Sequence, residues 1–151
     1  MSLHSVVVVG IAVTLGSACK KESEVKKANA LHSTIELFPS ETGKLEISDV
    51  GDKDVEISGE VKSLKPGNYV VHLHAPKGCS MPRDAHDAEN HHADIGVITA
   101  DSTGIAKIKM RTPGRLGGME PITGYCVVIY PPDLSSPVSR GTIYMSGFVG
   151  H

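Results

Sequence analysis

The chain has 151 residues, a formal net charge of −2 at pH 7, no tryptophan and only 4% aromatic residues. This length allows one domain with a real hydrophobic core, which has to be built from valine, isoleucine and leucine. Charges of both signs are mixed along the chain, which excludes the clustered basic face that nucleic-acid binding needs. After the N-terminal segment, no apolar run approaches the length of a transmembrane helix.

Residues 1–19 have the pattern of a secretory signal. The apolar run Val6–Val13 is followed by small residues and Cys19, as at the end of a signal segment. A cysteine directly after Gly16-Ser17-Ala18 is similar to a bacterial lipobox, in which the cysteine is lipidated. We therefore expect export to the periplasm or cell envelope, with a lipid anchor at Cys19 as the only membrane contact; the alternative for Val6–Val13 is a buried strand. Residues 20–33 are charged, as expected of a solvated tether.

From residue 34 onward, short runs of alternating apolar and polar residues are separated by turn residues. This alternation is typical of half-buried strands, and no stretch has a helical period. The predicted strands cover 34–38, 44–50, 55–61, 69–74, 95–100, 105–110, 125–130 and 142–149. Asp101-Ser102-Thr103-Gly104 predicts a hairpin turn. Eight short strands with some long connections predict an all-β Greek-key sandwich or barrel over residues 34–151.

Histidines are concentrated in one part of the chain, since five of the eight lie within the 23 residues from His72 to Asp94. His72 and His74 are two residues apart on a predicted strand, so their side chains point to the same face. More candidate ligands follow in the expected loop: His86, His91, His92 and Asp94. Imidazole suits zinc and copper, and imidazole with carboxylate suits zinc. A lone histidine is usually an ordinary surface or core residue, but this density predicts a site for Zn²⁺, Cu²⁺ or both.

Two cysteines lie outside the N-terminal segment, Cys79 and Cys126. If the chain is exported to an oxidising compartment, they could form a disulfide. The alternative is two separate buried thiols, and the sequence leaves both open.

The order of these motifs resembles the copper/zinc superoxide dismutase family. Val55–Gly67 looks like the strand, turn and strand that lead to the family's His-x-His, and Gly78-Cys79-Ser80 matches its loop cysteine. His91–Gly96 is similar to its His-x-Gly-Asp-Leu-Gly segment, and the hairpin at 99–104 follows at the family's place. Arg140 falls where the family carries its active-site arginine. The resemblance implies an eight-stranded, flattened Greek-key barrel related to immunoglobulin-like sandwiches.

Carried over residue by residue, the resemblance also implies a set of metal ligands. His72 and His74 match the first two copper ligands. His86 matches the imidazole that bridges copper and zinc and gives a proton to departing peroxide. His91 and Asp94 match two zinc ligands.

Two further residues take supporting roles by the same resemblance. Asp133 is implied as an acceptor that orients the ligating histidines. Arg140 is implied as the cation at the mouth of the copper site that attracts an anion.

Two departures from the family's pattern bear on the chemistry. The loop between His86 and His91 is short, so the middle zinc histidine has no match, and the residues that could replace it are His92, Asp87 and Glu89. Where the family has a copper-ligating histidine, this chain has Tyr130, whose phenol is a poor ligand at neutral pH because its ordinary pKa is about 10. Tyr130 either binds copper(II) or only lines the pocket.

Three functions are therefore open. The first is an exported superoxide dismutase that converts superoxide to O₂ and H₂O₂ at a modified copper site, with Arg140 and His86 as catalytic residues. The second is a non-enzymatic zinc- or copper-binding protein of the envelope, and the third is a barrel that has lost the chemistry. Arg140 favours the enzyme, because a storage protein has little need of an anion-attracting group. Tyr130 and the short loop favour the metal binder.

Overall fold

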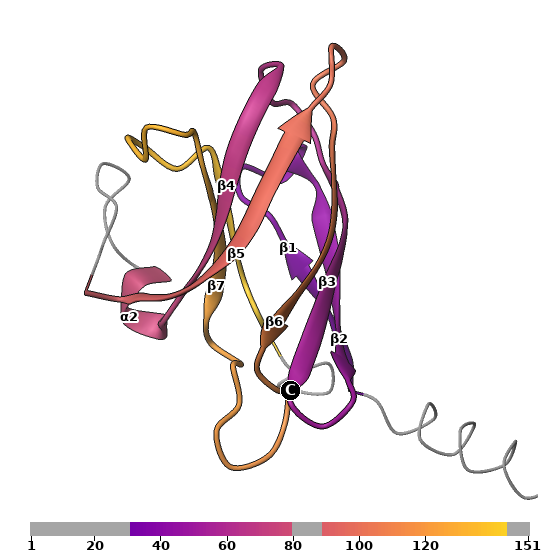
Figure 1. Ribbon diagram of the computed structural model, residues 1–151, viewed down its shortest axis with the longest axis vertical. Coiled ribbons are helices and arrows are strands. Elements are labelled where there is room, and N and C mark those ends of the chain that lie inside the picture. Colours follow the sequence, from indigo (N-terminus) through magenta and orange to yellow (C-terminus); the bar gives the residue numbers. More distant parts are fainter. Residues whose placement is uncertain (1–30, 80–88, 145–151) are drawn as a thin grey trace, which may run out of the picture.

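The computed structural model describes residues 31–79 and 89–144 (Figure 1). The expected signal and lipidated Cys19, the first part of the tether, His86 and Asp87 lie outside the described residues. So does the end of the last predicted strand, residues 145–149.

The described chain forms one eight-stranded antiparallel sheet that curls into a nearly closed barrel (Figure 1). The order of its strands is β1-β2-β3-β6-β5-β4-β7-β8, which confirms the predicted all-β Greek-key fold. The elements are β1 (His32–Glu36), the 3₁₀ turn η1 (Ser40–Thr42), β2 (Lys44–Val50), β3 (Asp54–Val61), β4 (Gly67–His74), the single helical turn α2 (Pro76–Cys79), β5 (His91–Ala100), β6 (Ala106–Pro113), β7 (Cys126–Tyr130) and β8 (Ser139–Thr142).

Several strand boundaries differ from those predicted, and three of the differences affect the ends of the sheet or the histidine-rich segment. The first strand begins at His32, within the predicted tether, and the last covers Ser139–Thr142 rather than 142–149. Ser139 and Gly141 are buried, and Ile35 of β1 lies against Gly141, so β8 forms where it can pack on β1. The third difference is in β5, which begins at His91 and includes residues that were predicted to lie in a loop.

The two ends of the sheet meet between β1 and β8. Phe38, just after β1, donates its N–H to the carbonyl of Arg140 at 2.7 Å and accepts from the Arg140 N–H at 3.0 Å. On the opposite side of the barrel, the pairing of β5 with β6 is limited to Ala100 and Ala106, next to the hairpin turn. From that turn the two strands diverge (Figure 1).

The interior of the barrel is filled by aliphatic side chains, as the scarcity of aromatic residues requires. They come from alternate positions of the strands, for example Leu45 and Ile47 on β2 and Val71 and Leu73 on β4. Strand β7 differs, because all five of its residues are buried. Its outward-facing residues form a second, smaller cluster with Cys79 and Leu134: Cys126, Val128 and Tyr130. The outer face of the sheet is therefore covered at β7.

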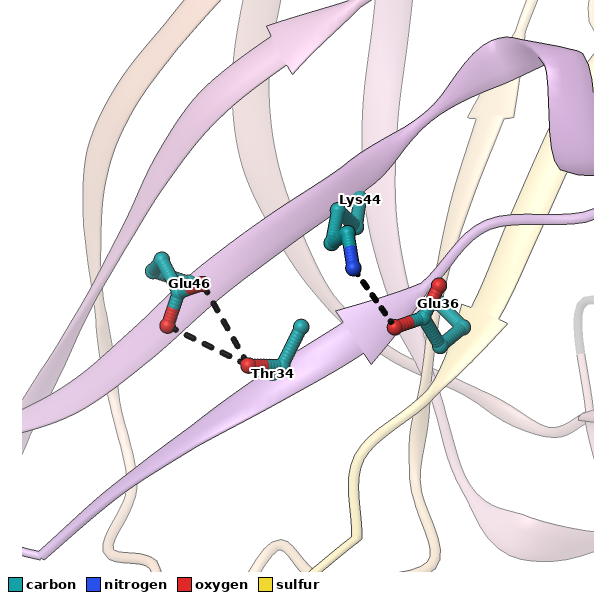
Figure 2. A network of polar contacts seen from close by, with 4 residues as sticks. All are labelled: Thr34, Glu36, Lys44 and Glu46. Atoms are coloured by element: carbon teal, nitrogen blue, oxygen red, sulfur yellow. Dashed lines mark hydrogen bonds and ion pairs between the residues drawn. The ribbon is translucent and has the colours of Figure 1, made fainter.

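The outer face over β1, β2, β3 and β6 is exposed and charged instead. Lys44 pairs with Glu36 at 3.4 Å, and the hydroxyl of Thr34 donates to Glu46 (Figure 2). Exposed pairs of this kind each contribute only about 0–1 kcal/mol. This face is a solvated surface. Among the described residues, polar side chains are buried on the outside of the sheet only over β4, β5 and β7.

The hairpin between β5 and β6 is closed by Asp101. Its Oδ1 accepts hydrogen bonds from the Thr103 hydroxyl at 2.6 Å, the Thr103 N–H at 2.8 Å and the Ile105 N–H at 3.2 Å. These bonds, the one from the Thr103 side chain foremost, lower the pKa of the Asp101 carboxyl. This hairpin lies where the sequence predicted it.

We expect Gly141→Ala to destabilise the barrel at the β1–β8 contact. A Cβ atom on Gly141 would lie 2.5 Å from Cγ2 of Ile35 and 2.6 Å from the backbone oxygen of Glu36, so a strand has to move, at a cost of about 3 kcal/mol. Urea unfolding measures the loss. The matched control is Gly51→Ala, which has open space and φ +65° and should cost only about 1 kcal/mol; equal losses for the two variants would contradict the close contact.

Candidate metal centre

The candidate site is built by the register of β4 against β5. His72 lies opposite Asp94, and His74 lies opposite His91. Three residues of β4 (72–74) thus span the same length as four residues of β5 (91–94), and the extra residue, His92, forms a β-bulge. In a regular strand His91 and Asp94 would point to opposite faces, because they are three apart. The bulge turns both toward the face that carries His72 and His74.

Three of these side chains meet at their donor atoms. Nε2 of His72 is 3.2 Å from Oδ1 of Asp94, and Nε2 of His91 is 2.9 Å from the same oxygen. One ligand atom from each residue lies within 4.8 Å of the other two. His72, His91 and Asp94 are hereafter called the His–His–Asp group.

One side of the His–His–Asp group is buried in the protein, and the other side is open to solvent. His72 is only 4% exposed, whereas the side chain of Asp94 is 74% exposed. The group therefore offers donors held in place by the barrel while one edge stays open to solvent. Two imidazole nitrogens and one carboxylate oxygen are a zinc-type donor set, of the three-ligand kind that leaves one coordination position open.

His74 and Tyr130 lie directly beside this group. The ring of His74 is stacked on that of His72 with centroids 6.0 Å apart, and it meets the ring of His91 edge-on at 5.7 Å. The ring of Tyr130 is 5.5 Å from that of His72 and 6.0 Å from that of His74. Tyr130 is 3% exposed, so its ring forms a wall of the site, packed on the outer cluster of β7.

Of the residues suggested as replacements for the missing zinc histidine, His92 and Glu89 are described, and neither is part of the His–His–Asp group. The ring of His92 lies edge-on to Tyr125 with centroids 4.9 Å apart, because a bulge residue is turned away from its neighbours. Glu89 is exposed in the turn before β5. His86 and Asp87 lie outside the described residues.

Asp133 is placed apart from the histidines. Its Oδ1 accepts hydrogen bonds from the Ser135 hydroxyl at 2.8 Å and the Ser135 N–H at 3.1 Å. The bond from the Ser135 side chain is the first cause of a lowered pKa of the Asp133 carboxyl. This carboxylate closes the turn after β7, and the acceptor that contacts His72 and His91 is Asp94.

Arg140 lies in the same cross-strand row as His72. His72 is opposite Val128, and Val128 is opposite Arg140, so the two outward-facing residues are separated by two strand spacings, about 10 Å. Nη1 of Arg140 donates to the carbonyl oxygen of Cys79 at 3.3 Å. The guanidinium group is thus held against the segment that covers this face.

Cys79 and Cys126 are joined by a disulfide, with their Cα atoms 5.7 Å apart. The bond fastens α2 to the first residue of β7. Because Cys126 is opposite His74 on β4, the disulfide lies at the border of the site.

The family resemblance implies a copper set that includes His72 and a zinc set that includes His91 and Asp94, and among the described residues these three lie together. The feature that sequence reasoning missed is the bulge. A signal for it was present: His-x-His on one strand faces His-x-x-Asp on the next, and the two spacings can share a face only if the second strand carries an extra residue.

Comparisons with known proteins support the fold of this chain and no property beyond the fold. No family model matches the chain. Among solved structures, the chain is similar to the crystal structure of the clock protein EA4, with a TM-score of 0.51 and 20% sequence identity. The match covers 77% of this chain and 92% of that one. At this identity, the likeness supports the fold alone.

The residues that the structure describes include no helix that is both long and apolar enough to span a membrane.

Proposed function

We propose that this protein is a metal-binding protein of the cell envelope, which holds a divalent ion, zinc by its donor set, at the His–His–Asp group. The observation that carries the proposal is the convergence of three donor atoms within 4.8 Å of one another. A bulged strand brings these atoms together, and bulges are frequent next to functional sites, where they re-aim a side chain.

The donor set fits a zinc ion well. His72, His91 and Asp94 would hold it, and the bound ion would supply Lewis acidity at an open coordination position. The protein's own contribution is to fix the two imidazoles on paired strands. A metal bridging β4 and β5 also stabilises the folded state, because unfolding has to release it.

Replacing His72 by alanine tests the proposal. Losing one of three ligands should weaken Zn²⁺ binding by about 100-fold or more, which corresponds to about 2.7 kcal/mol, and isothermal titration calorimetry measures the change. The matched control is His92→Ala, which removes an imidazole outside the group and should bind Zn²⁺ normally. Unchanged affinity in a His72→Ala protein with the circular dichroism of a folded barrel would refute the proposal.

A second candidate function is dismutation of superoxide, and the position of Arg140 favours it. Its cationic side chain lies two strands from His72 on the same face and would draw a small anion toward the site. Bound copper would supply the one-electron chemistry, with His72 and His74 as ligands and His86 as the proton donor that the resemblance implies. Protein loaded with both copper and zinc should then remove superoxide, and Arg140→Gln should slow this at low ionic strength. If the protein shows no activity with both metals bound, dismutation is excluded and metal binding is the remaining proposed function.

A further inference from the structure

We propose that reduction of the disulfide creates a second metal site, formed by Cys79, Cys126 and His74, which takes zinc or a similarly thiophilic divalent ion. This site differs from the His–His–Asp group and does not depend on it. It also gives a role to His74, which lies beside that group without belonging to it.

The strand register brings His74 and Cys126 together. The two residues are directly opposite on β4 and β7, so their side chains leave the same face of the sheet with Cβ atoms about 5 Å apart. Both are fully buried, at 1% exposure each. The sheet thus holds Cys126 beside His74 on one face, whether or not the disulfide is formed.

The helical turn α2 brings the other sulfur to the same place. Gly78 lies against the imidazole so closely that a Cβ atom there would be 3.1 Å from Nδ1 of His74. The next residue is Cys79, whose Sγ lies 4.0 Å from the carbonyl oxygen of His74. Glycine at residue 78 permits this approach, and α2 therefore covers His74 with Cys79 at its end.

The redox step is an ordinary thiol–disulfide exchange with a dithiol reductant. One thiolate of the dithiol attacks a sulfur of the Cys79–Cys126 bond, and its second thiol releases the mixed disulfide. The protein bond gains two electrons and two protons, and the dithiol loses the same and becomes a disulfide. Binding of a divalent ion then displaces the two thiol protons to solvent.

The resulting donors suit a thiophilic metal. Two thiolates and one imidazole are a set that zinc adopts in proteins, with each sulfur about 2.3 Å from the ion. The sulfur atoms start as bonded neighbours, so they need to move apart only slightly to hold one ion between them. In the oxidised protein the same sulfur atoms have no charge to offer, so the second site exists only after reduction.

The test uses full-length protein that carries Asp94→Asn, which weakens the His–His–Asp group, and Co²⁺ alone as the probe. After reduction with a phosphine under anaerobic conditions, one Co²⁺ should bind per chain with a sulfur-to-cobalt charge-transfer absorption. The oxidised protein and a Cys126→Ser variant should lack this absorption. Adding His74→Ala should weaken Co²⁺ binding about tenfold or more, whereas adding His92→Ala should leave it unchanged.

Two results would overturn the inference. One is the absence of charge-transfer absorption in the reduced protein. The other is equal Co²⁺ affinity in the His74→Ala and His92→Ala variants, which would mean that the cysteines bind alone or that reduction unfolds the barrel, as circular dichroism of the same samples would reveal.

Discussion

Deleting His92 should leave metal binding at the His–His–Asp group intact, although it removes the bulge. The rest of β5 is fixed by its pairing with β4, in which Val71 faces Gly96 and Tyr69 faces Ile98. Without the extra residue, His91 stands two residues from Asp94 and stays opposite His74, so in a regular strand both side chains point to the face of His72. All three ligands would remain, and Zn²⁺ affinity should stay within about tenfold of the wild-type value, equivalent to about 1.4 kcal/mol.

The comparison with His92→Ala makes this deletion informative. The substitution removes the same imidazole but keeps the number of residues in β5, so the bulge and the zinc affinity should both survive. Calorimetric titration with Zn²⁺ measures both variants, and circular dichroism checks that the barrel is intact. Loss of zinc binding in the deletion variant alone would contradict this register, since it would mean that His91 no longer shares a face with Asp94.

Replacing Tyr130 by histidine should give the largest gain in copper binding. The tyrosine ring is buried beside the rings of both His72 and His74, so an imidazole there adds a third nitrogen donor where the wild-type protein has a phenol. Copper(II) affinity should rise by at least about tenfold, which needs only about 1.4 kcal/mol. Any dismutase rate should rise with it.

Tyr130→Phe is the matched control, since it keeps the ring and removes only the hydroxyl. We expect copper affinity in this variant to equal that of the wild type, because the ring acts as a wall of the site. Electron paramagnetic resonance of Cu²⁺ counts the coordinating nitrogens and should gain one in Tyr130→His alone. A spectrum and an affinity unchanged by Tyr130→His would place this residue outside the reach of the metal.

Much of the architecture is readable from the sequence because the period of a strand is simple. Alternation predicts most of the strands, and the two-residue spacing of His72 and His74 predicts that they share a face. The first part of strand β5 was not predicted in this way. It carries extra residues at His92 and Ile95 relative to β4, so its first half does not alternate and resembles a loop.

Contacts that depend on register could not be predicted in the same way. Whether Cys79 reaches Cys126 depends on how β7 pairs with β4 and on where α2 folds, and their sequence separation of 47 carries no such information. The position of Asp133 is a similar case. Because Asp133 follows β7 closely in the sequence, it could have lain near the histidines. In the structure its carboxylate accepts hydrogen bonds from the nearby Ser135 instead.

The narrow junction between β5 and β6 divides the molecule into two mechanical parts. One comprises β1, β2, β3 and β6, and the other comprises β5, β4, β7 and β8, which carries every described ligand. An ion bound between β4 and β5 cross-links strands of the second part only. In native-state hydrogen exchange, metal should therefore slow the amides of that half selectively, and the charged half should open and close at a rate of its own.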